Sequence, residues 1–291
     1  MKNSKIFNLA IDIIFIIMTL GYFIPVLMIF IISFSGEAGF TTYGFKFWPD
    51  EWSFAAYSAL FKNFGVMLRA MILTMAIALL ATTLGIAVNC MLAYPMTRKD
   101  DFVFYKPVNV LLLGTMFVSG GLMPTYMIYT QIYGLKDNPL VYLIPGVGAW
   151  GIMVYKTFFK GVPTSLIEAA EIDGASQFKT LIRIILPLSK PIIAMNFFSG
   201  VVGGWNSWQT SLIYITKQEW WTVQYLMQKI LQDANQLVMA LQNAGVTDTS
   251  SIPVETMKYA MCVFATLPIL LLFPKMQKYF SKGIAVGAVK E

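Results

Sequence analysis

Six uninterrupted stretches of uncharged, mostly apolar residues run through the chain and limit its fold more than any other feature. They are residues 13–34, 70–97, 107–135, 138–155, 191–216 and 259–274. A helix rises about 1.5 Å per residue and a bilayer core is about 30 Å thick, so the first five stretches are long enough to cross it. The sixth has 16 residues and becomes long enough if Lys258 extends its ammonium group to the interface. The predicted fold is therefore all-α, a polytopic membrane protein with six transmembrane helices.

The amino-acid composition agrees with a membrane location and excludes several kinds of chemistry. Apolar residues make up 57% of the 291 residues and charged residues 12%, whereas a typical soluble domain has about 25% charged residues. The absence of histidine excludes histidine-dependent triads and HExxH zinc sites, and no metal site is expected. Cys90 and Cys262 lie in apolar stretches, so we expect small hydrophobes rather than a disulfide. The first stretch is too long for a cleaved signal peptide and is expected to remain as an anchor.

Lysine and arginine are distributed unevenly between the two sides of the predicted membrane. Placing the N-terminus inside puts 14 of the 21 Lys and Arg residues on the inner side and 7 on the outer side. Because inner loops carry the excess of basic residues, both termini are predicted to be cytoplasmic. The net charge of +6 is then a topology signal, and no nucleic-acid partner is expected. We expect a first helix and extracytoplasmic segment (1–66), a transmembrane core (67–280) and a C-terminal tail (281–291).

One inner loop, residues 163–187, combines charged residues with two short helical patterns. Ser165 and Glu168 have the S-x-x-E spacing of a capping box, which predicts a helix start. Asp173-Gly174 predicts a sharp turn, since glycine adopts positive φ at little cost. A second helix with an apolar stripe is predicted after this turn, and Leu186-Pro187 is expected to stop it.

Two interpretations of this loop follow from its residues. One is a helix lying on the membrane surface, with Lys179 and Arg183 touching lipid headgroups. Against it, the first half carries Glu168, Glu171 and Asp173, which anionic lipid would repel. We therefore favour a protrusion that docks into a groove on another cytoplasmic protein.

The same loop resembles the EAA motif of the membrane-spanning subunits of bacterial ABC importers. The motif reads Glu-Ala-Ala, three residues, Gly, nine residues, Ile-x-Leu-Pro, and its positions are matched by Glu168, Ala169, Ala170, Gly174, Ile184, Leu186 and Pro187. The stretches 119–126, 203–208, 273–280 and 283–290 are similar to the carbohydrate-uptake permeases. The closest likeness is to the second of their two permease subunits, such as the small permease of the maltose transporter, and to the lipoprotein-fed subgroup that serves complex oligosaccharides.

This resemblance implies a role, a location and a set of partners. In the family, the motif segment is a coupling helix in a cleft of a cytoplasmic ATPase, which Glu168 would contact while Gly174 allows the turn. The implied coupling residues are Glu168, Ala169, Ala170, Asp173, Gly174, Leu186 and Pro187. The implied partners are a homologous permease, two ATPase subunits that bind ATP and Mg, an extracytoplasmic solute-binding protein, an oligosaccharide and membrane lipid. The chain itself would hold no cofactor and catalyse no reaction, would lie in the bacterial cytoplasmic membrane, and would reach between the ATPases with its C-terminal tail.

The residues themselves agree that energy must come from another chain. No Gly-Lys dipeptide occurs, so there is no P-loop of the GxxxxGK[ST] type. The six predicted spans contain no acid or base, which proton-coupled and many ion-coupled carriers need near the midplane. A transporter without either source of energy needs an external one.

The candidate solute path lies on the fifth stretch. Sugars are recognised by aromatic faces and by groups that bond hydroxyls, within mostly apolar walls. Such side chains are supplied by Trp205, Asn206, Trp208 and Gln209, and by Tyr126 on the third stretch. The alternative is a structural role, in which Gly200-x-x-x-Gly204 packs closely on another helix and the tryptophans and Asn206 contact neighbouring helices.

Other functions remain open at this point. An intramembrane enzyme is disfavoured because Ser176, in "DGAS", has no histidine to activate it. A channel would need carbonyl loops or rings of charge, which the sequence lacks. A scaffold permease whose partner holds the substrate site, or a permease for a solute other than a sugar, is the alternative to a sugar-binding permease.

Overall fold

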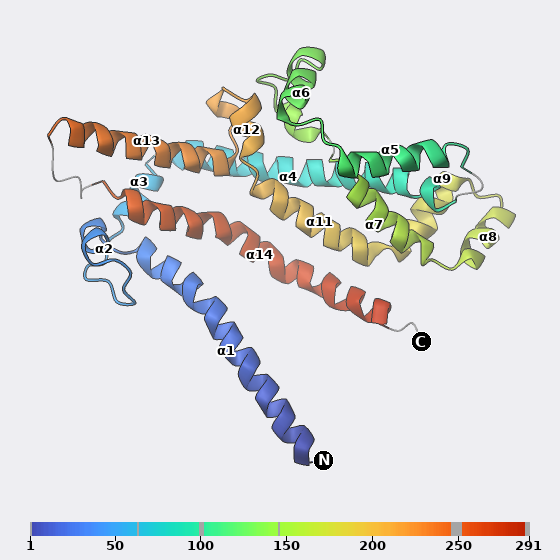
Figure 1. Cartoon of the computed structure of the whole chain (residues 1–291), viewed down its shortest axis with the longest axis horizontal. Helices are drawn as coiled ribbons and strands as arrows, with labels where there is room; N and C mark the ends of the chain where they lie inside the picture. Colours follow the sequence, from blue (N-terminus) through green and yellow to red (C-terminus); the bar gives the residue numbers. More distant parts are fainter. Residues whose placement is uncertain (1, 63, 99–101, 145, 246–251, 289–291) are drawn as a thin grey trace. The chain divides into compact units, whose positions relative to one another are not determined.

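The structure is a computed structural model that describes residues 2–62, 64–98, 102–144, 146–245 and 252–288, with side chains undescribed at 2–6, 10, 273 and 275–288 (Figure 1). Within these residues every named element is a helix, and β pairing is limited to an isolated bridge between Ser35 and Trp52. The all-α prediction is confirmed. The chain divides into two compact units: Met1–Met67 with Leu226–Leu270 (unit 1), and Leu68–Tyr225 with Leu271–Glu291 (unit 2).

In unit 1, the carboxylate of Glu37 caps the start of a helix. Glu37 accepts hydrogen bonds from the backbone N of Glu255 at 2.8 Å and of Thr256 at 2.9 Å. Helix starts leave such N–H groups without partners, and an acidic side chain there also complements the helix dipole. The elements of this unit are α1 (Lys2–Ser33), α2 (Glu37–Tyr43), α3 (Ala55–Leu60), most of α13 (Val223–Asn243) and the start of α14 (Val254–Ala288). In the predicted tail (281–291), α14 continues to Ala288, and residues 289–291 lie outside the described residues.

Unit 2 contains the remaining helices, many of them short. They are most of α4 (Phe64–Ala93), η1 (Pro95–Thr97), α5 (Tyr105–Phe117), α6 (Leu122–Met127), η2 (Ile128–Ile132), η3 (Pro139–Leu143), α7 (Ala149–Lys160), α8 (Thr164–Ile172), α9 (Gln177–Thr180), η4 (Leu181–Ile185), α10 (Leu186–Leu188), α11 (Lys190–Trp205), α12 (Gln209–Tyr214) and η5 (Gln218–Trp220). The end of α4, α7 and η4 share one apolar core, whose buried members are Cys90, Ala93, Tyr94, Ile152, Tyr155, Phe159, Val162, Leu181 and Ile185.

Helices α11 and α4 pack closely through two glycines. A Cβ added to Gly200 would lie 2.6 Å from Thr82 Cγ2, and one added to Gly204 would lie 3.0 Å from Ala78 Cα. Real Cβ atoms essentially never come as close as 2.6 Å, and at 3.0 Å the neighbouring helix would have to shift, so glycine is favoured at both positions. The structural interpretation of Gly200-x-x-x-Gly204, close packing on another helix, is confirmed.

Three helices among the described residues are long and apolar enough to cross a membrane: Phe7–Ser33, Phe64–Thr97 and Val254–Leu272. Two bent pairs raise the number to five if each pair is one span. They are Tyr105–Phe117 with Leu122–Ile132, bent by 118°, and Gln177–Leu188 with Lys190–Trp205, bent by 81°. Length and composition therefore support up to five spans, against the six predicted.

The predicted spans at 107–135, 138–155 and 191–216 are not continuous straight helices. The first bends before α6, where Gly121 has a φ of +79°. In the second, η3 ends at Leu143 and α7 begins only after the extended Gly148. In the third, residues 206–208 separate α11 from α12. The absence of charge does not reveal these breaks: the first two contain glycine, which disfavours a continuous helix, and the third contains the uncharged residues Asn206, Ser207 and Trp208.

Candidate functional site

We call the loop at residues 163–187 the coupling segment. Its first helix is α8. It begins at Thr164 after Pro163, and no side chain caps it, so the predicted capping box of Ser165 and Glu168 is wrong. Pro163 has a φ of −56° and leads the chain into the helix. Ser165 then falls inside the first turn, beyond the position from which a hydroxyl caps a helix.

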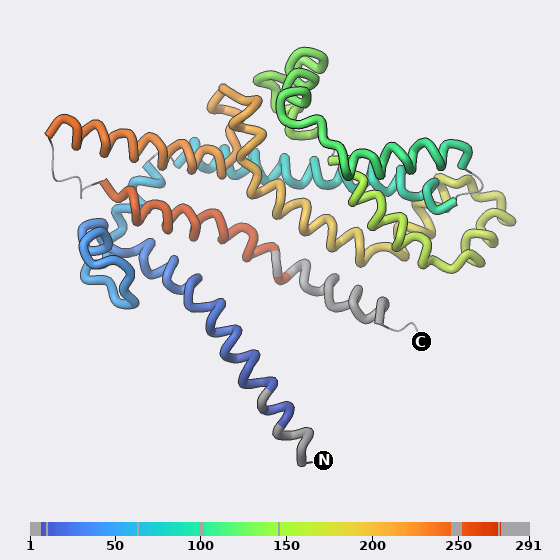
Figure 2. Tube along the Cα trace, in the orientation of Figure 1, coloured from blue at the N-terminus to red at the C-terminus, as the bar shows by residue number. Residues whose placement is uncertain are grey.

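Gly174 turns the chain between α8 and α9. Its φ is +71°, and Ala175 N donates to Ala170 O at 2.9 Å across the turn. Helices commonly end on a left-handed glycine with such a bond. Figure 2 shows the sharp reversal of the tube between the two helices. The predicted turn at Asp173-Gly174 is confirmed.

The second helix of the coupling segment runs from Gln177 to Leu188 through α9, η4 and α10. The helix continues one residue past Pro187 and ends there, so the predicted stop at Leu186-Pro187 is confirmed to within one residue. In η4, a wide turn, Leu186 N donates to Leu181 O five residues earlier. Such a turn loosens the helix just before the proline, whose ring would otherwise clash with the preceding turn. The helix ends at Leu188, and the chain bends by 81° into α11.

The solvent-exposed face of the coupling segment, which we call its outer face, carries both acidic and large apolar side chains. Its exposed apolar residues are Leu166 (44%), Ile172 (88%), Phe178 (58%) and Ile182 (45%). The predicted coupling residues divide as follows: exposed are Glu168, Ala169, Asp173, Gly174 and Pro187, half-buried is Leu186, and buried is Ala170. Clustered exposed apolar side chains rimmed by charge are typical of a protein contact surface.

The inner side of the coupling segment is joined to the chain after α4 by polar contacts. Glu171 forms an ion pair with Arg98 and accepts a hydrogen bond from Gln177 Nε2 at 3.0 Å. Gln177 Oε1 accepts one from Tyr94 OH at 2.8 Å. The Gln177 hydrogen bond and then Arg98 lower the pKa of the Glu171 carboxyl. We call these four residues the coupling tie. No local sequence pattern predicts it, because Arg98 and Glu171 are 73 residues apart.

A second carboxylate, Asp137, joins two loops elsewhere in unit 2. Its Oδ1 accepts from Thr216 Oγ1 at 2.8 Å and from Lys217 N at 3.3 Å, and its own N donates to Tyr214 O at 2.9 Å. The hydrogen bonds from Thr216 are the main reason that the pKa of the Asp137 carboxyl is lowered. Asp137 adopts a φ of 55°, which aspartate tolerates better than most residues.

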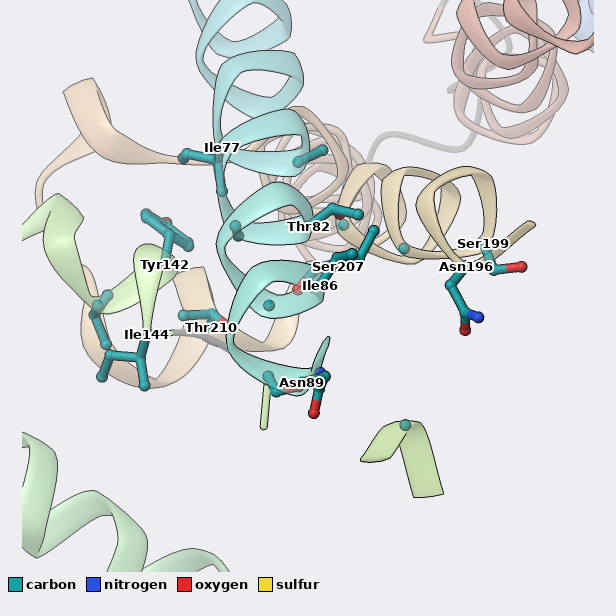
Figure 3. A pocket seen from close by; sticks show the side chains of 18 of the residues that line it. Ile77, Thr82, Ile86, Asn89, Tyr142, Ile144, Asn196, Ser199, Ser207 and Thr210 are labelled. Atoms are coloured by element: carbon teal, nitrogen blue, oxygen red, sulfur yellow. The ribbon is translucent and has the colours of Figure 1, made fainter. Parts of the chain in front are cut away.

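A cavity of about 680 Å³ lies within unit 2, lined by α4, η3, α7, α11 and the chain that follows α11 (Figure 3). Among the described residues that line it, none carries a formal charge. Its polar and aromatic lining includes Asn89, Tyr129, Tyr142, Trp150, Tyr155, Asn196, Ser199, Ser207, Thr210 and Tyr214. In Figure 3, Asn89 projects from α4 while Asn196 and Ser199 project from α11. An uncharged lining that mixes apolar surface with amides and hydroxyls suits a neutral polar ligand.

Two buried polar atoms of this lining have no hydrogen-bond partner within the described part of the chain: Tyr155 OH and Asn89 Oδ1. Tyr155 is 2% exposed and Asn89 is 7% exposed. The amide of Asn89 is held in place by its Nδ2, which donates to Gly146 O at 3.1 Å. Tyr142 OH, by contrast, bonds Ser211 Oγ at 2.8 Å. Since an unsatisfied buried polar group costs about 1–3 kcal/mol, a polar molecule in the cavity would relieve a real penalty.

The residues predicted for the solute path do not line this cavity. Trp205 is 1% exposed. Asn206 is exposed, and its Oδ1 accepts from Gln224 Nε2 at 3.4 Å. Trp208 is half-buried and Gln209 is exposed. Because the chain breaks at 206–208, Asn206 and Gln209 do not share one helical stripe.

Tyr126 also lies outside the lining, but it touches a residue that belongs to it. Its ring stacks on Tyr214 at 5.7 Å between centroids, and Tyr214 lines the cavity. The sequence prediction missed Asn89, Trp150 and Tyr155. Their only signal was a polar or aromatic residue inside an apolar stretch, which many other residues share.

Comparison with known proteins places the chain among permeases. No protein-family model matches it. YtcP, a polygalacturonan/rhamnogalacturonan transport system permease protein of Bacillus subtilis (strain 168), is 28% identical over 291 residues, which cover 100% of both chains. Protein LplC of the same organism is 32% identical over 273 residues, which cover 92% of this chain and 89% of LplC. A crystal structure of a bacterial ABC transporter involved in the import of the acidic polysaccharide alginate matches the fold with a TM-score of 0.78 at 24% identity, over 96% of this chain and 98% of that one.

Proposed function

The chain belongs to the permease family of carbohydrate ABC importers, and we propose that it is the second of the two permease subunits of an importer for an oligosaccharide. Members of this family are integral membrane subunits that carry solute while a separate ATPase hydrolyses ATP. The chain is therefore a transport subunit rather than an enzyme. Membership also implies a partner permease, an ATPase and a solute-binding protein.

The finer arrangement is part of the proposal. Both termini lie in the cytoplasm of a bacterial cell, the chain crosses the cytoplasmic membrane six times, and two ATPase subunits hold ATP and Mg while this chain binds no cofactor. The excess of lysine and arginine on the inner side supports the orientation. The lack of any Gly-Lys dipeptide supports ATP binding by a partner. The relative named for polygalacturonan and rhamnogalacturonan supports a saccharide as the solute.

The observation that carries the proposal is the two-sided coupling segment. Its outer face offers Glu168 and exposed apolar side chains such as Ile172 to a partner. Its inner side is bound to the interior, through Leu181 and Ile185 in the shared core and through Glu171 in the coupling tie. A force applied to the outer face by a closing ATPase would therefore move α4 and α7 with the segment. This is the requirement for converting ATP-driven closure into alternating access.

Helix α11 gives the movement a second route. It follows the coupling segment after the 81° bend and is locked to α4 at Gly200 and Gly204. Because packed helices switch between discrete arrangements rather than deform continuously, α4 and α11 are expected to move together.

The proposal is tested by measuring ATP hydrolysis by the chain with and without its ATPase partner. The purified chain alone is expected to hydrolyse no ATP, and hydrolysis should appear only with the ATPase partner. Glu168→Lys should weaken ATPase binding about 10- to 100-fold, because a hydrogen bond to a charged group is worth about 1.5–3 kcal/mol. Glu219→Lys, which reverses another exposed acid, is the matched control. ATP turnover by the isolated chain, or full binding by Glu168→Lys and uptake at the wild-type rate, would contradict the proposal.

A scaffold permease, whose partner alone contacts the solute, is the second candidate function. It is favoured by the position of Trp205, Asn206, Trp208 and Gln209 outside the cavity lining. Solute-stimulated ATP hydrolysis by the reconstituted importer distinguishes the two, since a scaffold permease would tolerate polar-to-apolar changes in its own cavity.

A further inference from the structure

We propose that the cavity of unit 2 binds uncharged sugar rings of the transported oligosaccharide. Tyr155 and Asn89 would bond their hydroxyl groups, and Trp150 would cover a ring face. This inference rests on the proposed function and assigns to it a site outside the stretch 205–209. The solute chemistry that it specifies is neutral, although the relative YtcP is named for polygalacturonan, whose sugar units carry carboxylates.

The polar atoms of the cavity match a hydroxyl ligand. Tyr155 OH donates one hydrogen bond and accepts others, whereas Asn89 Oδ1 only accepts. Both atoms have less than 1 Å² of accessible surface and no partner among the described residues, so a ligand bonds them only after a shift of the lining; their residues line the same cavity. A sugar hydroxyl is both donor and acceptor, so it satisfies either atom. Neither residue would have to break an existing bond, because Asn89 is held by its other amide atom, Nδ2.

The absence of charge in the lining selects against acidic sugars. No carboxylate, ammonium or guanidinium group belongs to the described residues that line the cavity. A carboxylate moved from water into such surroundings loses its hydration and gains no cationic partner, which is strongly unfavourable. A neutral ring loses only hydroxyl hydration, which Tyr155 and Asn89 replace.

Trp150 supplies the apolar side of the site. It lines the cavity yet is 73% exposed, so its ring remains available to a ligand. The C–H face of a pyranose ring is apolar, and contact with an indole ring removes apolar surface from water. Its position at the start of α7, five residues before Tyr155, places both side chains on one element.

The test uses the complete importer, with both permeases and the ATPases, in lipid nanodiscs. Maltotetraose serves as the neutral probe and tetragalacturonate as an acidic probe of equal length, and saturation-transfer NMR reports their binding. Tyr155→Phe removes one buried oxygen atom that has no partner among the described residues, so assembly should persist and Tm should stay equal or rise. Maltotetraose should bind about fivefold more weakly, which corresponds to one hydrogen bond. Tyr57→Phe, whose hydroxyl lies 2.9 Å from Ser33 Oγ in unit 1, should bind it normally.

Trp150→Leu gives a second, independent variant and should also weaken maltotetraose binding. Tetragalacturonate should bind at least tenfold more weakly than maltotetraose to the wild type. Equal binding of maltotetraose by the wild type, Tyr155→Phe and Trp150→Leu overturns the inference, as does equal binding of the two probes or no maltotetraose binding at millimolar concentrations. ATP hydrolysis is measured on the same samples: if it depends on Glu168 while the probe results are negative, only this inference fails. If the assembled complex hydrolyses no ATP, the proposed function fails.

Discussion

The coupling segment and the cavity use polar groups in opposite ways. In the coupling segment, Glu171 is satisfied within the chain by Arg98 and Gln177. In the cavity, Tyr155 OH and Asn89 Oδ1 have no partner among the described residues. Satisfied polar networks make a structure rigid, whereas an unsatisfied buried group stays costly until a ligand binds. The first region is built to transmit movement and the second to receive a molecule.

One apolar core connects the two regions. Tyr155 from the cavity and Leu181 and Ile185 from the coupling segment belong to the same buried cluster. Interiors of this kind are close-packed and transmit displacement rather than absorb it. A shift of the coupling segment is therefore expected to alter the cavity, which is the property that an ATP-driven permease needs.

The largest effect is expected from a change that breaks both regions together. Gly200→Ala places a Cβ 2.6 Å from Thr82 Cγ2, and overpacking of this kind costs about 1–3 kcal/mol. The yield and Tm of the assembled importer should both fall. Gly203→Ala on the same helix is the control, because no atom of the described part of the chain lies within 4 Å of its added Cβ. Thr82→Ala should partly restore Gly200→Ala; no loss in the single variant, or no rescue in the double variant, would contradict the close packing of α11 on α4.

Gly174→Val should break the coupling segment and spare the cavity. The left-handed conformation costs a residue with a Cβ about 1–2 kcal/mol, and a β-branched residue more. No atom of the described residues lies within 4 Å of a Cβ added at Gly174, so backbone strain is the main effect. ATP hydrolysis should become uncoupled from uptake while assembly and probe binding persist.

Two further variants sharpen this result. Gly174→Asn should retain more coupling, since asparagine tolerates positive φ. Gly134→Val imposes similar strain at a φ of +62° in another loop and should leave the ratio of ATP hydrolysed to solute moved unchanged. Normal uptake by Gly174→Val would contradict the coupling role and favour the alternative, a helix that lies on the membrane surface.

The sequence predicted the coupling segment far better than the cavity, and the reason is distance along the chain. The turn at Gly174 depends on a few adjacent residues, which a local pattern captures. The coupling tie joins residues 73 positions apart, and the cavity draws on α4, η3, α7 and α11. No local pattern specifies such neighbours. The capping box at Ser165 failed for a smaller reason: the helix starts two residues earlier than predicted, with Pro163 instead of Ser165 at the capping position.

A smaller effect is expected from Glu171→Gln, which weakens the coupling tie without straining the backbone. Because the folded-state pKa of Glu171 is lowered, its charge stabilises the folded chain above the unfolded pKa, about 4.3, and this stabilisation is lost as pH falls through the folded value. The wild type should thus lose Tm in acid more steeply than Glu171→Gln. Glu171 is exposed and Arg98 is half-buried, so at neutral pH we expect coupling of ATP hydrolysis to uptake to fall only about two- to fivefold.

Asp137→Asn is the matched carboxylate change for this experiment. The pKa of Asp137 is lowered as well, by hydrogen bonds from Thr216, so its contribution is lost in the same direction as pH falls. It should therefore flatten the acid dependence of Tm in the same way while leaving coupling intact. Equal loss of coupling in both variants would mean that the coupling tie has no special role.

The smallest effect is expected from Asn206→Leu and Gln209→Leu, and it decides between two positions for the solute path. Both side chains are exposed and outside the cavity lining, and Asn206 bonds Gln224 at 3.4 Å. A hydrogen bond contributes about 0.5–1.5 kcal/mol and this one is long and exposed, so uptake per assembled complex should fall less than about threefold, close to the value for the exposed control Trp48→Leu. The assignment of Trp205, Asn206, Trp208, Gln209 and Tyr126 to the solute path stays a prediction until this measurement. A tenfold loss of uptake in Asn206→Leu with intact assembly, together with normal uptake by Tyr155→Phe, would place the solute path at the break between α11 and α12. Reduced uptake by Tyr155→Phe with nearly normal uptake by Asn206→Leu would place it in the cavity.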